Sequence, residues 1–158
     1  MSFEFNADEI FALAEQIEKN GEQFYRSSAK KIADSNAIQL LLNLADMEVE
    51  HLKTFRGMRV ELTDADKKTM TFDPNSEAGL YLAALAKTKV FFEKEIGPSD
   101  LKGIFMAALA AEKDSIAFYL GMQDLVPSGS GREKIEAIIR EEMRHIRLLG
   151  EKLAILKK

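Results

Sequence analysis

The sequence predicts an all-α protein: an antiparallel four-helix bundle in which one long crossover contains an extra helix. Three observations lead to this prediction. Apolar residues recur at helical spacing through most of the 158 residues. Two pairs of long helical segments are each joined by a short connection, which makes the members of a pair antiparallel neighbours. A pattern of glutamate, tyrosine and histidine in the first pair recurs 94 residues later in the second, so both pairs are expected to build one structure.

The composition is that of one globular domain. Hydrophobic residues make up 46% of the chain and charged residues 30%, with a formal net charge of −4. A chain of this length can bury a sizeable core, so residues 1–158 are assigned to a single domain. The charge balance offers no basic face for nucleic acid, and no apolar run approaches the length of a membrane span. The first ten residues lack the features of a signal peptide, so a cytoplasmic location is expected.

The first predicted hairpin spans residues 7–56. Asn6 and Glu9 have the spacing of a capping box, which predicts a helix that begins after Asn6 and runs to about Ala33. Three capping residues at 34–36 interrupt the pattern, and a second helix follows to about Phe55.

The predicted crossover spans residues 57–98. Residues 57–75 have no sustained periodicity and are expected to form a long connection. Ser76 is expected to cap a helix that stops before Gly97 and Pro98. This helix has more apolar surface than one face of a bundle can cover, which predicts a homodimer or small oligomer. The apolar residues in question are Tyr81, Leu82, Leu85, Phe91 and Phe92.

The second predicted hairpin spans residues 99–158. Ser99 and Asp100 are expected to open a helix that runs to about Val126. The segment PSGSG at 127–131 predicts a flexible loop. The last helix is expected to run from Arg132 nearly to Lys158.

Both histidines of the chain follow a glutamate at the same spacing. Glu48 stands three residues before His51, and Glu142 stands three residues before His145. Residues at i and i+3 lie on one face of a helix. Each pair can therefore present a carboxylate and an imidazole to one metal ion, and two such helices are typical of dimetal carboxylate bundles.

Two further glutamates complete a repeat. Glu18 stands 30 residues before Glu48, and Glu112 stands 30 residues before Glu142. The segments that they begin, EKNGEQFY and EKDSIAFY, share Glu, Lys, Phe and Tyr at the same offsets. This internal repeat predicts a pseudo-symmetric site to which all four bundle helices contribute.

The repeat predicts a site for two metal ions. Four carboxylates clustered in a core would repel one another, whereas two divalent cations make the filled site formally neutral. Oxygen and nitrogen ligands suit iron or manganese and also accept zinc, and we favour iron because it supports redox chemistry. The ions are expected about 3.5–4 Å apart. Cysteine is absent, which excludes thiol ligands and thiol catalysis. The predicted ligands are Glu18, Glu48, His51, Glu112, Glu142 and His145.

Four nearby residues have less specific interpretations. Tyr25 and Tyr119 lie two turns after Glu18 and Glu112, either as core tyrosines with one satisfied hydroxyl or as donors to a ligand carboxylate. Two more glutamates, Glu50 and Glu141, are expected to be solvated. No catalytic residue beyond the metal ligands is predicted.

With these motifs, nearly the whole chain resembles the rubrerythrin-like branch of the ferritin-like diiron carboxylate proteins. The resemblance implies that Glu48 and Glu142 bridge two iron ions. It implies that Glu18 is a terminal ligand of the iron held by His51, and that Glu112 is the terminal ligand of the iron held by His145. Two departures are evident: Ser115 stands where rubrerythrins carry a further carboxylate, and a rubredoxin-like domain with four cysteines is missing.

The resemblance implies an oxidoreductase that reduces hydrogen peroxide or dioxygen at its diiron site. The electrons would have to come from a separate donor protein, such as a rubredoxin. Two alternatives remain open at this point. The same site could oxidise ferrous ion for iron handling, as a ferroxidase does, or the metals could merely stabilise the bundle without redox chemistry.

Overall fold

The computed structural model describes residues 7–61, 76–88, 99–126 and 130–156. The described residues form α-helices and contain no strand, which confirms the all-α class. The helices are α1 (Ala7–Ala29), α2 (Ser35–Val60), α4 (Glu77–Thr88), α5 (Leu101–Leu125) and α6 (Ser130–Leu156).

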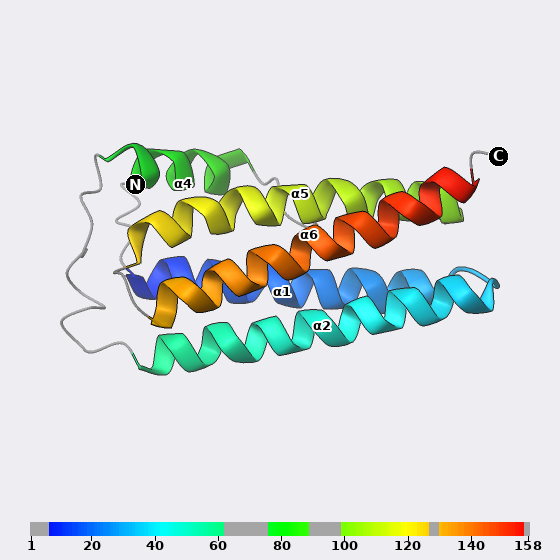
Figure 1. The fold of residues 1–158 in the computed structure, drawn as a ribbon, viewed down its shortest axis with the longest axis horizontal. Helices are drawn as coiled ribbons and strands as arrows, with labels where there is room; N and C mark the ends of the chain where they lie inside the picture. The colour runs from blue at the N-terminus through cyan, green and yellow to red at the C-terminus, as the bar shows by residue number, and fades with distance from the viewer. Residues whose placement is uncertain (1–6, 62–75, 89–98, 127–129, 157–158) are drawn as a thin grey trace.

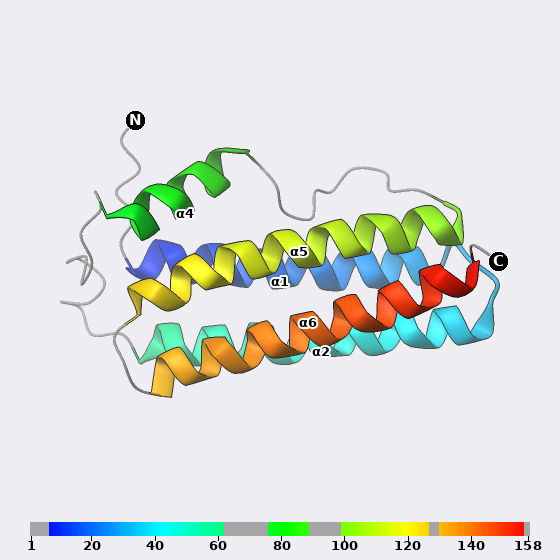
Figure 2. The same ribbon diagram turned by 45° about the horizontal axis from the view of Figure 1, so that its top comes forward.

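Four long helices lie side by side, and each runs antiparallel to the two that it packs against (Figures 1 and 2). The main contacts are those within the hairpins, α1 with α2 and α5 with α6; contacts of α1 with α5 and of α2 with α6 join the two hairpins. Each of the four helices therefore packs against two others, and the bundle is closed on all four sides. No described helix combines the length and hydropathy that a membrane span requires.

Short polar side chains begin three of the helices. The Asp34 carboxylate accepts a hydrogen bond from the backbone N–H of Ala37 at 2.9 Å, and α2 follows it directly. Asp100 does the same for α5 through the N–H of Gly103 at 3.3 Å. Each cap satisfies a backbone donor that the helix itself leaves unpaired. Ser76 caps α4 in the same way, whereas the capping box predicted at Asn6 lies outside the described residues.

Helix α2 is longer than the sequence predicts, because it continues to Val60 instead of ending near Phe55. The additional turn is held by contacts that only the folded chain supplies. Met58 is buried in the core, and the Arg59 guanidinium donates to Asp8 at 2.7 Å and to Glu15 at 2.8 Å, both on α1. The crossover therefore begins after Val60, not at residue 57. Helix α1 ends earlier than predicted, at Ala29.

The crossover helix α4 packs against α5 through a close approach at Gly121. A Cβ at this position would lie 2.8 Å from a ring carbon of Tyr81 and 2.9 Å from a methyl of Leu82. Leu82 is buried, and the Tyr81 hydroxyl donates to the backbone carbonyl of Ala117 at 2.7 Å. The predicted continuation of this helix, with Phe91 and Phe92, lies outside the described residues. The oligomeric state stays a prediction.

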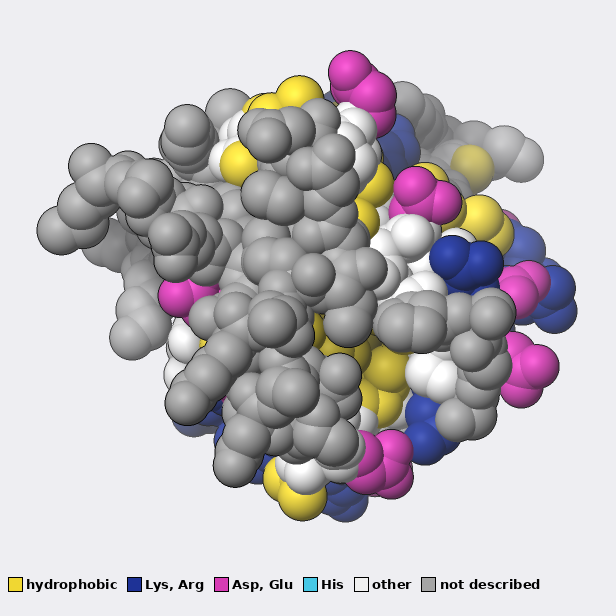
Figure 3. All heavy atoms as spheres, turned by 90° about the vertical axis from the view of Figure 1, so that its left-hand side faces the viewer, with side chains coloured by type: hydrophobic (Ala, Val, Ile, Leu, Met, Phe, Trp, Pro, Cys, Tyr) yellow, Lys and Arg dark blue, Asp and Glu magenta, His cyan; other side chains and the backbone are white. Residues whose placement is uncertain are grey.

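The apolar core consists of two clusters, and buried polar residues separate them along every bundle helix. One cluster includes Ile17, Phe55 and Tyr119, and the other includes Tyr25 and Leu44. Figure 3 views the bundle from the end near α4, where charged side chains lie mainly around the edge of the described surface and hydrophobic ones appear both near the centre and at the edge. The polar layer between the clusters is where the predicted ligands lie.

Candidate metal centre

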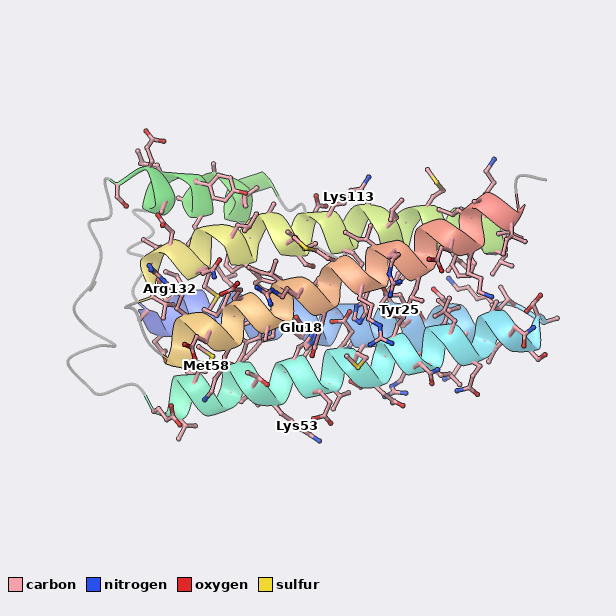
Figure 4. All side chains as sticks on the ribbon, viewed as in Figure 1. Glu18, Tyr25, Lys53, Met58, Lys113 and Arg132 are labelled. Atoms are coloured by element: carbon pink, nitrogen blue, oxygen red, sulfur yellow. The ribbon has the colours of Figure 1, made fainter. Side chains whose placement is uncertain are left out.

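The structure brings all six predicted ligands together in the middle of the bundle. Figure 4 shows Glu18 at this level, between the helices. Each of the six residues is at most 2% exposed. Their position follows from the repeat, since each hairpin supplies one glutamate from its first helix and a Glu-x-x-His pair from its second. The six are Glu18 on α1, Glu48 and His51 on α2, Glu112 on α5, and Glu142 and His145 on α6.

The six side chains form two overlapping groups, and in each group the potential ligand atoms all lie within 4.8 Å of one another. Glu48 and Glu142 belong to both groups. Glu18 and His51 complete one group, and Glu112 and His145 complete the other. Two adjacent ion positions that share two carboxylates are the arrangement that this overlap favours.

Each imidazole presents its Nδ1 to the carboxylates. His51 Nδ1 lies 2.9 Å from Glu142 Oε1 and 3.5 Å from Glu18 Oε2. His145 Nδ1 lies 3.2 Å from Glu142 Oε2 and 3.3 Å from Glu112 Oε1. The two rings are stacked, with centroids 5.9 Å apart and an interplanar angle of 22°. The geometry is therefore nearly two-fold symmetric, with Glu142 between the rings.

Burial makes ionisation of the carboxylates unfavourable. Burial, followed by the charge of Glu142, raises the pKa of Glu112 to about 8. Burial and the charges of Glu142 and Glu18 raise the pKa of Glu48 well above its ordinary value. Burial opposes ionisation of Glu142 too, but its contacts with Glu112 and both imidazoles hold its pKa below the ordinary value. Glu142 is thus ionised more readily than Glu48 or Glu112.

Both histidines are held in the protonated form when no metal is bound. Burial lowers the pKa of His51, but the carboxylates of Glu142 and Glu18 outweigh burial and raise that pKa to about 11. For His145 burial is likewise outweighed, by Glu112 and Glu142, and the pKa rises to about 9. Metal binding at these nitrogens must therefore displace protons.

The oxygen and nitrogen atoms of the cluster are better suited to binding metal ions than to hydrogen bonding with one another. Among the described residues, seven buried side-chain atoms of this cluster have no hydrogen-bond partner, although several lie close together. Each such atom costs about 1–3 kcal/mol if nothing satisfies it. A set of carboxylate oxygens and imidazole nitrogens matches iron, manganese or zinc, and each ion would satisfy several atoms at once. The atoms are Glu18 Oε2, Glu48 Oε1, His51 Nδ1, Glu112 Oε2, Glu142 Oε1 and Oε2, and His145 Nε2.

The two tyrosines bond to the outer glutamates across the bundle. The Tyr25 hydroxyl on α1 donates to Glu112 on α5, and the Tyr119 hydroxyl on α5 donates to Glu18 on α1 at 2.6 Å. Both tyrosines are fully buried. Burial and the neighbouring carboxylates, Glu112 and Glu18 respectively, raise both tyrosine pKa values well above the ordinary value, so both hydroxyls remain donors. Of the two interpretations of these residues, the structure selects the donor to a cluster carboxylate.

Glu141 makes a contact that the sequence interpretation did not include. Its carboxylate accepts a hydrogen bond from His51 Nε2, on the side of the ring that faces away from the cluster. Its side chain is 45% exposed, so it is only partly solvated. The contact joins α6 to α2, and sequence spacing does not specify a contact between helices. Glu50 agrees with expectation, since it is exposed and pairs with Lys53 at 3.1 Å.

Two small residues occupy equivalent positions, one turn after the outer glutamates. Gly21 leaves room for Glu48, because a Cβ there would lie 3.1 Å from the Glu48 carboxyl carbon. Ser115 is buried, and its hydroxyl donates to the Ala111 carbonyl of its own helix at 2.9 Å. Ser115 therefore adds no ligand where the resemblance would place a carboxylate.

Comparison with known proteins supports the fold. No protein-family model matches the sequence, and no curated protein sequence matches it. A crystal structure from Thermotoga maritima, at 2.30 Å resolution, is similar over 98% of both chains, with a TM-score of 0.72 and 22% sequence identity. That protein's descriptive name places it provisionally among ferritin-like diiron-carboxylate proteins. The present chain thus has the ferritin-like fold, with a buried Glu/His cluster that fits a metal site.

Proposed function

We propose that the protein is a diiron carboxylate redox protein of the rubrerythrin-like type, which reduces hydrogen peroxide or dioxygen with electrons from a separate donor protein. The overlap of the two ligand groups at Glu48 and Glu142 is the observation that carries the proposal, because it fits two adjacent ions. The name of the similar Thermotoga maritima protein agrees with this interpretation.

In this proposal Glu48 and Glu142 would contribute carboxylate oxygens to both ions. Glu18 and His51 would hold the first ion, and Glu112 and His145 would hold the second. Four carboxylates balance the charge of two divalent cations, which removes the repulsion within the cluster. When bound, two ferrous ions would supply two electrons together, enough to reduce an O–O bond without releasing a radical.

The chain's own residues prepare this site for small oxidants. Tyr25 and Tyr119 hold the outer carboxylates in place from the opposite helix. The apolar clusters on both sides of the polar layer exclude bulk water, so the charges of the site are weakly screened. Six protein ligands leave coordination positions open on two ions, as a site for peroxide or dioxygen requires.

Ferroxidation is the second candidate, and Ser115 favours it. The serine hydroxyl bonds to its own helix and supplies no additional carboxylate. An iron ion beside His145 would then have fewer ligands available when it changes oxidation state. A site of this kind could serve to oxidise ferrous ion for iron handling.

Stopped-flow oxidation of the anaerobic, iron-loaded protein tests the proposal. We expect two ferrous ions per chain, faster oxidation by hydrogen peroxide than by dioxygen, and two electrons transferred per site. If dioxygen is tenfold faster and a ferric mineral grows as iron is added, the function is iron handling. If neither oxidant changes the optical spectrum of the loaded protein, the metals have a structural role only.

A further inference from the structure

We propose that Glu141 is a positioning residue for His51, and that it makes the metal position beside His51 the tighter of the two. The inference rests on the proposed metal site and assigns a role to a residue outside the ligand set. Its basis is a difference between the two histidines. His51 Nε2 donates to the Glu141 carboxylate, whereas His145 Nε2 is buried without a hydrogen-bond partner among the described residues.

The His51 ring is held from both edges. Its Nδ1 faces Glu142 at 2.9 Å inside the cluster, and its Nε2 faces Glu141 at the surface. With a metal on Nδ1, the proton of the ring is on Nε2, where it is donated to Glu141. Such a bond fixes the tautomer and the ring orientation and makes the ligand nitrogen a better electron donor.

The His145 ring has no equivalent support from the repeat. Glu141 directly precedes Glu142, and the residue that directly precedes Glu48 is Met47. By the 94-residue offset of the repeat, Met47 on α2 is the counterpart of Glu141 on α6, and we infer that it lies beside His145 as Glu141 lies beside His51. A thioether is only a weak acceptor, so it cannot replace a carboxylate. The two otherwise similar metal positions differ at this point.

Titration with Co²⁺, followed by its d–d absorption, tests whether the two positions differ. We expect the unmodified protein to bind two Co²⁺ ions in two resolved steps. His51→Ala should remove the tighter step, and the weaker step should disappear in His145→Ala. Two equal steps in the unmodified protein, or loss of the weaker step in His51→Ala, would overturn the proposal.

Substitution of Glu141 tests its positioning role. Glu141→Met, which copies the residue of the other half, should weaken the tighter step 10- to 100-fold and leave the weaker step unchanged. Glu141→Gln keeps an oxygen acceptor and should lose less affinity. Glu136→Gln is the matched control, because Glu136 also lies on α6 and its side chain is 48% exposed, against 45% for Glu141. The control should bind both ions as the unmodified protein does.

The reverse exchange provides an independent test. Met47→Glu should supply the missing acceptor to His145 and strengthen the weaker step, so that the two steps move closer together. Steps that move further apart would contradict the proposed correspondence of these positions. In the Zn²⁺-loaded protein, the Nε2–H proton resonance of His51 should lie far downfield, and it should shift upfield in Glu141→Met but not in Glu136→Gln.

The outcomes separate this proposal from the proposed function. If two Co²⁺ ions bind with unchanged affinities to a folded Glu141→Met protein, as judged by circular dichroism, Glu141 has no positioning role and the metal site still stands. If the unmodified protein binds no Co²⁺, the metal site itself is wrong and the role of Glu141 falls with it.

Discussion

The two halves of the repeat, residues 18–51 and 112–145, carry the same candidate ligands but are not equivalent in structure. The two halves interact directly. The tyrosine of each half donates to the outer glutamate of the other half, and Glu142 lies close to both imidazoles. Neither hairpin alone could assemble either ligand group, because each group draws on both hairpins. The repeat therefore encodes one shared centre, not two separate ones.

The halves differ at residues that are close in sequence to the candidate ligands. Gly21 in the first half corresponds to Ser115 in the second, and Met47 corresponds to Glu141. The glycine allows Glu48 to approach α1, while Glu141 bonds the imidazole of the opposite half. The comparison teaches that the repeat keeps the six candidate ligands, while the residues beside them differ between the halves.

The largest expected effect is the loss of one metal ion from one half. His51→Ala and His145→Ala should each remove about one ion per chain, because each deletes the single nitrogen ligand of one group. Metal analysis after dialysis measures the stoichiometry, and Glu50→Gln is a surface control. Two tightly bound ions in His51→Ala would show that the ligand assignment is wrong.

The metal-free centre should make stability fall as pH rises. The pKa values of His51 and His145 are raised to about 11 and about 9, and that of Glu112 to about 8. Between its unfolded and folded pKa values, each group binds more protons in the folded chain than in the unfolded chain. Its contribution to the free energy of unfolding is therefore full below the unfolded pKa and is lost as pH rises through the folded pKa. Thermal unfolding of the metal-free protein should show a lower Tm at pH 9 than at pH 6.5.

Bound metal should reverse part of this trend. Since metal ions replace the protons of the cluster, affinity for Zn²⁺ should increase over the same range and binding should release protons. The Tm of the Zn²⁺-loaded protein should fall less between pH 6.5 and 9. Equal slopes for the loaded and metal-free proteins would contradict this account of the cluster.

A smaller effect is expected where Glu48 approaches Gly21 closely. Gly21→Ala should cost the metal-free protein little, because Glu48 can shift and alanine favours a helix by up to ~1 kcal/mol. In the loaded protein Glu48 is fixed by the ions, and a Cβ 3.1 Å from its carboxyl carbon should lower the Tm gained on metal binding. Gly57→Ala is the control, since a Cβ there meets nothing within 4 Å. An equal metal-induced gain in both variants would exclude this role for Gly21.

The smallest expected effect is that of removing one tyrosine hydroxyl. Tyr119→Phe leaves the core packing in place but deletes the donor to Glu18, which should cost about 1–3 kcal/mol. Tyr25→Phe should have a similar cost through Glu112, because the two bonds are reciprocal. Chemical denaturation of both variants measures this, and a large difference between them would mean that the halves differ here as well.

The clustering of the six candidate ligands could be predicted from the sequence because their signal is local and repeated. The spacing of Glu48 with His51, copied by Glu142 with His145, depends only on the geometry of a helix. The all-α class followed from periodicity in the same way. The contact of Glu141 with His51 could not be predicted, because its partner lies on another helix and the repeat has a methionine at the corresponding position.

The end of α2 shows the same limit for the fold. The residues after Phe55 have little periodicity, and their helix is held by tertiary contacts of Met58 and Arg59. A pattern within one segment cannot report such contacts. For Tyr25 and Tyr119, the spacing predicts that each lies on the same helix face as its upstream glutamate. It does not predict that each donates to the glutamate of the opposite half.

Iron-edge anomalous diffraction from crystals of the iron-loaded protein tests the central claim most directly. The account predicts two anomalous peaks about 3.5–4 Å apart. One should lie beside Nδ1 of His51 and the other beside Nδ1 of His145, with Glu48 and Glu142 between them. A single peak, or peaks outside the six buried side chains, would contradict it.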